Sequence, residues 1–256
     1  MSTALDILQF IETIAPKELK MDWDNVGLLC GRSNKEVRKV LVALDPFPHV
    51  CQEASQIGAD LLVTHHPLIF QPLLSVTEQT TIGQAILELT SHDITAINAH
   101  TNLDCADGGV NDTLAQCLGL SNIRKIPEDT LGLLRQGETA EQDLNAFLAH
   151  VKQALGCESL RYVSGGKPVR RVAVGGGSCG SGLPAVLDSG CDTFVTADVK
   201  YNQFCDAEAL GINLIDAGHF HTENPTCAVL AEKIQKAFPD IQVVLSKIHK
   251  DCVKFY

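Results

Sequence analysis

The chain lacks any apolar run long enough to cross a membrane. None of its uninterrupted hydrophobic stretches approaches the roughly 18 residues that a membrane-spanning helix needs. Its first twenty residues also lack the positive start and continuous apolar core of a secretion signal, because Asp6 and Glu12 interrupt their pattern. They predict an amphipathic helix instead. We therefore expect a cytoplasmic protein with no membrane partner.

Positive charge is scarce as well. The 20 Lys and Arg residues are outnumbered by 31 Asp and Glu residues, which gives a formal net charge of −11 at pH 7. An acidic chain is repelled by duplex nucleic acid and by anionic membranes, so neither is expected as the main partner. A small phosphorylated substrate remains open, because a bound metal ion can supply positive charge locally.

Ten cysteines are present, but no two have the C-x-x-C spacing of a zinc ribbon or a redox motif. Most stand in apolar surroundings, as Cys117 does in LAQCLGL. This pattern is typical of a reduced cytosolic protein that uses cysteine as a small hydrophobic residue.

Short apolar runs alternate with helical patterns along the whole chain. ADLLVTHH and ITAINAH have the character of buried strands, and TIGQAILELTSHD between them has a helical pattern. The same alternation returns in the second half, from RRVAVGGGS through INLIDAGH to IQVVLS. It predicts an α/β protein whose mostly parallel or mixed sheets are covered by helices.

The two halves of the chain resemble each other. We expect one α/β domain over residues 1–127 and a second over residues 128–256, whose C-terminal part packs back on the first. GADLLVTHH, which begins at Gly58, aligns with GCDTFVTAD, which begins at Gly190, at an offset of 132. The shared frame G-x-D-x-x-V-T indicates an internal duplication, although two buried strands can also look alike by chance.

Polar side chains cluster after three of the expected strands. The clusters are His65 with His66, His100 with Asp104, and Asp216 with His219, His221 and Glu223. In an open α/β sheet ligands bind at the carboxyl edge of the strands, so segments far apart in sequence can share one cleft. Imidazole and carboxylate groups bind Zn, Fe, Mn, Co and Ni. More donors than one tetrahedral ion needs favour a centre with two ions.

Other polar features have simpler interpretations. The remaining histidines lie in helical or surface contexts and are interpreted as structural or solvated: His49, His92, His150 and His249. The run GGGS (175–178) lacks the Lys-Ser/Thr of a phosphate-binding loop and the full G-x-G-x-x-G frame, which favours a strand-to-helix turn. Its backbone N–H groups could still face an anion if the turn borders the metal cleft.

With these motifs assembled, the chain resembles the Nif-three-like family, whose bacterial members carry the name of type 2 homologues of GTP cyclohydrolase I. The motifs are WDNVGL (23–28), VTHHPLIF (63–70), AHTNLD (99–104), VTADVKY (195–201) and DAGHFHTE (216–223). The length is similar to that of the short form, which lacks an inserted middle domain. The resemblance implies two interlinked α/β domains and a toroidal homohexamer.

The resemblance also implies a site for two divalent transition-metal ions per subunit. Carried over by motif position, its ligands are His65, His66, Asp104, His219 and Glu223. His221 does not occupy a ligand position of the family pattern. Tyr201-Asn202 stands where relatives often have Tyr-His, so no histidine is expected to act there.

Two functions fit this site. The first is a metal-dependent hydrolase, cyclohydrolase-like or directed at phosphoesters, that acts on a nucleotide or related heterocycle through activated water. In it His100 would serve as acid or base, and Asp198, which aligns with His66, would orient a ligand or relay a proton. The second is a non-enzymatic metal-binding or regulatory ring. An open coordination position beside a pocket would favour the enzyme.

Overall fold

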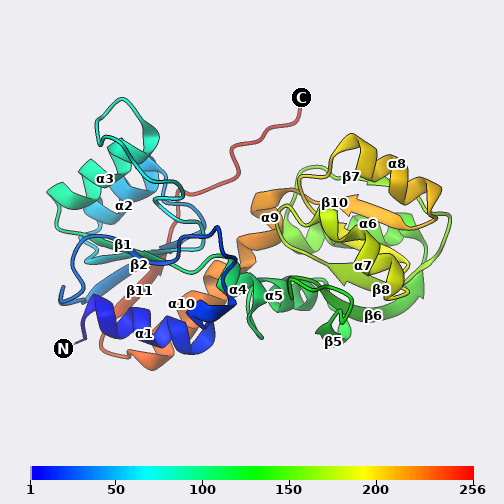
Figure 1. Ribbon diagram of the computed structural model, residues 1–256, viewed down its shortest axis with the longest axis horizontal. Helices are drawn as coiled ribbons and strands as arrows, with labels where there is room; N and C mark the ends of the chain where they lie inside the picture. Colours follow the sequence, from blue (N-terminus) through cyan, green and yellow to red (C-terminus); the bar gives the residue numbers. More distant parts are fainter. Residues whose placement is uncertain (1) are drawn as a thin grey trace. The chain divides into compact units, whose positions relative to one another are not determined.

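The computed structural model describes residues 2–256 and folds them into two compact units (Figure 1). Unit 1 holds the chain up to Asp107 together with Cys227–Lys250, and unit 2 holds Gly108–Thr226 and Asp251–Tyr256. This division by packing falls ahead of the boundary expected near residue 127. The reason is that helix α5 (Val110–Cys117) packs on strands of unit 2 rather than on those of unit 1.

Unit 1 contains a mixed sheet with the strand order β1-β4-β3-β2-β11. Its strands are β1 (Gly27–Cys30), β2 (Lys39–Ala43), β3 (Leu61–Thr64), β4 (Thr95–Asn98) and β11 (Gln242–Leu245). All are parallel to their neighbours except β1, which pairs antiparallel with β4 at one edge. Because β11 pairs with β2, a strand from near the end of the chain completes the sheet that the N-terminal half begins.

Helices cover both faces of this sheet. They are α1 (Ala4–Ile14), η1 (Lys17–Leu19), α2 (Pro48–Gln56), α3 (Thr81–Ser91), α4 (Thr101–Cys105) and α10 (Pro225–Ala237), of which α10 begins in unit 2. In Figure 1, α2 and α3 lie together on one face, and α1 and α10 lie along the other. The expected N-terminal helix ends at Ile14, because the residue before Pro16 avoids the helical conformation.

Unit 2 contains a mixed sheet with the strand order β5-β6-β8-β9-β10-β7. Its strands are β5 (Ser121–Lys125), β6 (Arg135–Gln142), β7 (Arg161–Val163), β8 (Val169–Val174), β9 (Thr193–Thr196) and β10 (Asn213–Asp216). Its helices are α5, α6 (Leu144–Leu155), η2 (Gly180–Gly182), α7 (Leu183–Asp188), α8 (Tyr201–Ala209) and α9 (His219–Glu223). The three central strands, β8, β9 and β10, are parallel.

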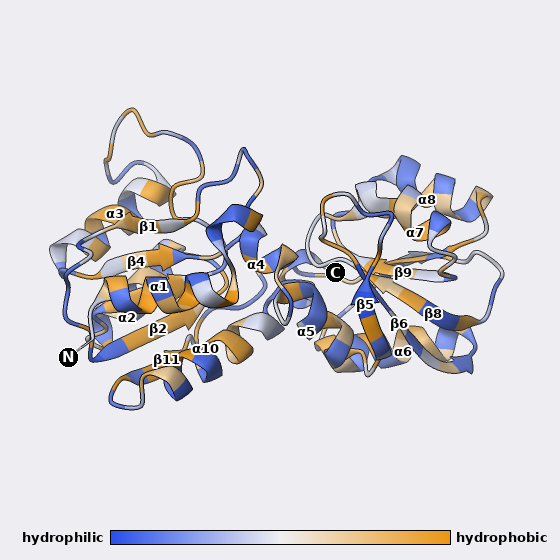
Figure 2. Ribbon diagram, turned by 60° about the horizontal axis from the view of Figure 1, so that its bottom comes forward, coloured by the Kyte–Doolittle hydropathy of each residue, from blue (hydrophilic) through white to orange (hydrophobic). Residues whose placement is uncertain are grey.

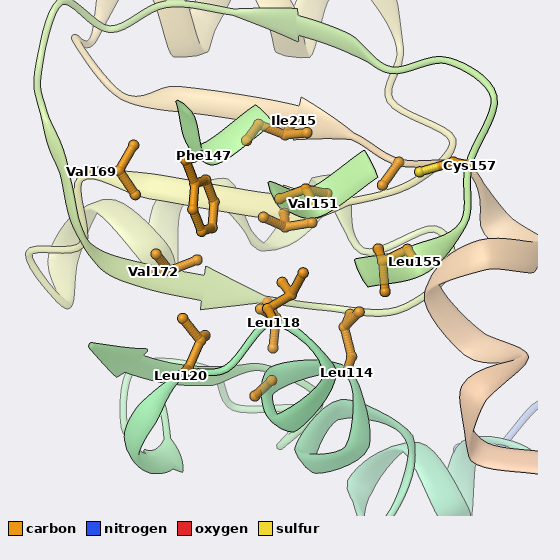
Figure 3. Packing of buried hydrophobic residues seen from close by; sticks show 14 residues of the cluster. Leu114, Leu118, Leu120, Phe147, Val151, Leu155, Cys157, Val169, Val172 and Ile215 are labelled. Carbon is orange, nitrogen blue, oxygen red and sulfur yellow. The ribbon is translucent and has the colours of Figure 1, made fainter. Parts of the chain in front are cut away.

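The central strands of unit 2 are buried on both faces. Successive side chains of a strand point to opposite sides, so Val172 joins a core with α5 and α6, whereas Ala173 joins a core with α7 and α8. Figure 3 shows Phe147 and Val151 of α6 in the first of these cores. Strands buried on both faces need continuous apolar runs. Figure 2 accordingly shows the inner strands β2 and β4 of unit 1 as mainly hydrophobic, whereas the edge strand β5 of unit 2 is largely hydrophilic.

The internal duplication expected from the sequence is visible in the register of the strands. Val40 of β2 pairs with Leu61 of β3, and Val172 of β8 pairs with Thr193 of β9, which is the same register 132 positions later. In both units a third parallel strand and then an antiparallel edge strand follow, namely β4 with β1 and β10 with β7.

The duplication extends to the side chain of the shared aspartate. Asp60 accepts hydrogen bonds from the backbone N–H groups of Arg38 and Lys39 at the start of β2. Asp192 accepts hydrogen bonds from the two equivalent N–H groups at the start of β8. Each carboxylate therefore fixes one parallel strand beside the next, which explains the aspartate of the G-x-D-x-x-V-T frame.

The remaining expectations concern membranes and cysteines. Over the described residues, no helix is long and apolar enough to cross a membrane. Within residues 2–256 the cysteines form no disulfide, and Cys51, Cys157 and Cys191 are buried. Burial raises the pKa of the Cys51 thiol to about 12, so this side chain is an inert apolar group.

Candidate metal centre

Unit 1 brings three histidines together at the carboxyl edge of its sheet. His65 and His66 directly follow β3, and His100 follows the neighbouring parallel strand β4. One ring nitrogen from each lies within 4.8 Å of the others, a spacing that could hold a metal ion. The sequence pattern predicted this convergence, because the ends of adjacent parallel strands meet at one edge.

Asp104 stands beside this cluster. It belongs to α4, which begins immediately after His100, and its Oδ1 lies 3.5 Å from His65 Nε2. Both side chains are buried, with relative exposures of 8% for Asp104 and 2% for His65. Burying a carboxylate costs free energy unless a cation or donors compensate it, so this arrangement suits a metal ligand.

The histidines of unit 1 are oriented through Nδ1. His65 Nδ1 lies 2.9 Å from the carbonyl oxygen of Ala99, which can only accept a hydrogen bond. His65 Nδ1 therefore carries the proton, and Nε2, on the side of Asp104, has the lone pair that a metal needs. His66 Nδ1 is 2.6 Å from Asp45 Oδ1, which completes a carboxylate–histidine pair of the kind found behind metal ligands.

Sequence reasoning missed Asp45 and the histidine behind it. Asp45 Oδ2 lies 2.9 Å from Nε2 of His249, a residue interpreted above as structural or solvated. Burial alone would raise the pKa of Asp45, but hydrogen bonds from His249 and His66 outweigh it and hold the pKa well below its usual range. Asp45 lies just after β2, the strand that pairs with β3. This place at the carboxyl end of a strand was the feature of the sequence that could have marked Asp45 as a site residue.

Asp24 is the second residue that sequence reasoning left without a role. Its Oδ1 lies 2.8 Å from His100 Nδ1, and its Oδ2 accepts hydrogen bonds from the backbone N–H and the hydroxyl of Thr101. Burial opposes ionisation of Asp24, yet these hydrogen bonds lower its pKa to about 2. An ionised Asp24 can only accept, so it fixes the tautomer of His100 with the proton on Nδ1 and the lone pair on Nε2. The feature of the sequence that could have marked Asp24 is its place in the motif WDNVGL.

Unit 2 carries a separate pair of donors. His219 is the first residue of α9 and Glu223 is its last, and their Nε2 and Oε2 atoms lie 3.0 Å apart. His219 Nδ1 lies 2.7 Å from Asp198 Oδ2, so Asp198 orients this imidazole as Asp45 orients His66. Glu223 is buried, with a relative exposure of 4%.

The glycine-rich turn after β8 shapes this pair. Gly176 N–H donates to Asn111 Oδ1 at 2.7 Å, and Gly177 N–H donates to Thr222 Oγ1 at 3.0 Å. Both N–H groups donate to side chains of the protein itself and are not available to bind an anion. The glycine run is therefore a strand-to-helix turn, as interpreted from the sequence. A Cβ on Gly177 would lie 2.1 Å from Glu223 Oε1, which is why glycine is needed there.

Both ring nitrogens of His221 have partners outside this donor pair. Its Nδ1 lies 3.2 Å from the carbonyl oxygen of Leu155, and its Nε2 lies 3.2 Å from Asp251 Oδ2. Both ring nitrogens therefore contact groups on other segments of unit 2. The structure thus groups the expected site residues in two sets, which are His65, His66, His100 and Asp104 in unit 1, and Asp198, His219 and Glu223 in unit 2.

The fold and these side chains define the class: a protein of two α/β units whose strand ends carry groups that could hold a metal ion. The family model Duf34/NIF3 (NGG1p interacting factor 3) matches residues 2–252, and the chain belongs to this family. The resemblance drawn from the sequence motifs is thereby confirmed.

Named relatives agree with this membership. A protein of Clostridium perfringens named GTP cyclohydrolase 1 type 2 homolog is 36% identical over 257 residues, with 98% of each chain covered. The crystal structure of a Bacillus cereus protein related to NIF3 superposes with a TM-score of 0.93 at 26% identity, covering 100% of this chain and 99% of that one. Reduced HcgD from Methanocaldococcus jannaschii gives a TM-score of 0.83 at 30% identity, covering 96% and 98%.

Proposed function

We propose that the protein is a dinuclear metal-dependent hydrolase that acts on a nucleotide or related heterocycle. The proposed ligands of its two divalent ions are His65, His66, Asp104, His219 and Glu223. One observation carries the proposal: Nδ1 of each of these three histidines has a fixed carbonyl or carboxylate partner. Such a partner leaves Nε2 as the ring nitrogen for a metal, which is the usual arrangement of metal-ligating histidines and supports the proposed ligand set.

The chemistry of the donors fits divalent transition metals. Neutral imidazole suits Zn, Fe, Co and Ni, and carboxylates suit Mn and also bridge pairs of ions. When bound, such ions would supply Lewis-acid activation of a water molecule near neutral pH. The names of the relatives point in the same direction, because a cyclohydrolase is a hydrolase of a heterocyclic ring.

His100 is the proposed acid–base residue. Its Nδ1 is fixed by the ionised Asp24, so its Nε2 is available to take a proton from, or return one to, the reacting group. Asp198 has the corresponding orienting role for His219 in unit 2.

Two exposed aromatic side chains support a planar substrate. Trp23 and Phe70 are 60% and 41% exposed, and each ring centroid lies 6.3 Å from that of His100. Large exposed aromatic rings beside a polar site offer stacking surfaces to a heterocycle. This favours a nucleobase-like ring over a flexible aliphatic substrate.

The test is a turnover screen of the protein with its metal restored. Purified protein is treated with a chelator, loaded in turn with Zn, Fe(II), Mn, Co or Ni, and supplied with nucleotides, nucleosides and simple phosphoesters. We expect ring opening or hydrolysis that the chelator abolishes and one metal restores best. Full metal occupancy without turnover of any of these compounds would instead support the non-enzymatic metal-binding or regulatory ring.

A further inference from the structure

A cavity of about 250 Å³ lies within unit 2, beside His219. Its walls come from the end of β10 and the start of α9, from β7 and the residues before it, and from the segment 251–256. Of its lining residues, only His219 and Asp198 have a role assigned above. Its volume is below the range of about 300–1,000 Å³ typical of sites for drug-sized ligands, so it would take one small group or ring.

Arg161 enters this cavity in a fixed orientation. Its Nη2 donates hydrogen bonds to Asp216 Oδ2 and, at 3.2 Å, to the carbonyl oxygen of Val199. Its Cζ lies 5.4 Å from the centre of the Phe204 ring, which supports the face of the guanidinium. Within residues 2–256, Nε and Nη1 make no hydrogen bond, and the side chain is 59% exposed. Arg161 therefore offers rigid, unused donors to the cavity.

Ser159 supplies a second donor to the same wall. Ser159 lies two residues before Arg161, the first residue of β7, and both line the cavity. The hydroxyl and the guanidinium therefore border the same space. The hydroxyl has no hydrogen-bond partner in the described part of the chain. A hydroxyl beside a guanidinium is a donor set suited to an oxyanion.

The carboxylates around the cavity already have partners. Asp198 contacts His219, and Asp251 contacts His221 at 3.2 Å. Asp216 accepts hydrogen bonds from the backbone N–H groups of Val199 and Gly218 as well as from Arg161. Asp216 is thus held by two backbone N–H groups and by Nη2 of Arg161, while Nε and Nη1 of Arg161 keep their donor capacity for an anion.

We propose that this cavity binds the anionic group, phosphate or carboxylate, of a small substrate of the metal centre. Arg161 and Ser159 donate to the anion, and the rings of Phe220 and Phe255 line the space for an adjoining apolar part. This inference rests on the proposed function in one respect: it calls the bound molecule a substrate because His219, a proposed metal ligand, lines the same cavity. The anion site itself rests only on the contacts of unit 2.

Phenyl phosphate and benzoate are the probes, since they carry the two anionic groups on the same ring. Their affinities for the metal-loaded protein are measured by isothermal titration calorimetry. We expect Arg161→Met to weaken the better probe by about 10-fold or more, the usual range for a lost hydrogen bond to a charged group. Arg170→Met is the matched control, because Arg170 is an exposed arginine of β8 outside the cavity. The probe that binds more tightly identifies the anion.

Two further variants guard against misfolding. Arg161→Met leaves Asp216 without its cation, whereas Arg161→Lys keeps the charge and Ser159→Ala does not touch Asp216 at all. We expect Ser159→Ala to weaken binding several-fold with an unchanged melting temperature. Unaltered affinity in folded Arg161 and Ser159 variants, or no binding of either probe to the wild type, would overturn the site. Binding that depends on Arg161 in a protein without hydrolase activity would retain the site and reject only the proposed function.

Discussion

At the scale of the residue, the character of each histidine is set by the group that holds its Nδ1. A carbonyl oxygen holds His65, and carboxylates hold His66, His100 and His219. Either acceptor places the proton on Nδ1 and leaves Nε2 as the atom that can reach a metal, and a carboxylate also brings negative charge beside the ring.

Removing one ligand from either unit tests the proposed centre. We expect His65→Ala and Glu223→Ala each to lower the metal content, because each deletes a buried donor atom at the end of a strand or helix. Elemental analysis of purified protein gives the metal content, and circular dichroism checks that the chain remains folded. Full metal occupancy in both variants would refute the assignment.

The role of His100 needs a different readout. If it carries a proton without binding metal, His100→Asn keeps both ions and lowers turnover by roughly 10²–10⁴-fold, the usual range for general acid–base catalysis. His92→Asn is a suitable control, because His92 is an exposed residue at the end of α3. Loss of metal in His100→Asn would make this residue a ligand or the support of one, and unchanged turnover would remove it from the mechanism.

Asp24 should contribute stability that depends on pH. Its pKa is lowered from 3.8 to about 2 because His100 and Thr101 donate to its ionised form against the effect of burial. A depressed pKa stabilises the fold above the unfolded value and loses this effect as the pH falls toward 2. The difference in free energy of unfolding between wild type and Asp24→Asn should therefore shrink between about pH 4 and pH 2. Urea unfolding at several pH values measures it, and a constant difference would contradict the prediction.

At the scale of the element, the sequence predicted the strands well because parallel strands leave a clear signal. β3, β9 and β10 have apolar residues at their centres and end in polar residues, and their ends are where the site residues lie. The helix α3 likewise occurs where the helical pattern of TIGQAILELTSHD indicated it. Local patterns of this kind depend only on neighbouring residues.

The supporting contacts could not be read from the sequence in the same way. His249 and Asp45 are 204 positions apart, and their contact arises because the segment after β11 returns beside β2. Strand β11 could in principle join either sheet, and no pattern among neighbouring residues determines that it pairs with β2. The contact of Gly177 with Glu223 is equally long-range, so the glycine run predicted a turn without showing what the turn packs against.

Gly177→Ala tests whether the turn after β8 positions the donors of α9. The new Cβ would displace the Glu223 carboxylate and would lie 3.0 Å from His219 Nε2, so we expect loss of metal bound through these residues. Gly156→Ala is the matched control, since Gly156 also has a positive φ of 66° but nothing within 4 Å of an added Cβ. Both variants should lose about 1–2 kcal/mol of stability from the left-handed backbone. Equal metal content in the two would contradict this role.

At the scale of the whole molecule, the two units share one strand arrangement and carry expected site residues at corresponding places. In each unit a five-residue helix follows the third parallel strand, α4 after β4 and α9 after β10. Asp104 stands in the first helix, and His219 and Glu223 stand in the second. The same place in the two sheets therefore carries expected site residues, with different residues in each unit.

Assembly is the last prediction, and it rests on family membership, since composition predicts no number of subunits. We expect a homohexameric toroid, and therefore a particle of six 27.6 kDa chains. Light scattering coupled to size-exclusion chromatography at micromolar concentration measures the mass directly. The same measurement on Glu223→Ala provides the control, because a ring held by contacts between subunits should keep its mass when the metal is lost. A mass of 27.6 kDa alone would refute the assembly. A hexamer of the wild type that dissociates in Glu223→Ala would instead make the metal centre part of what holds the ring together.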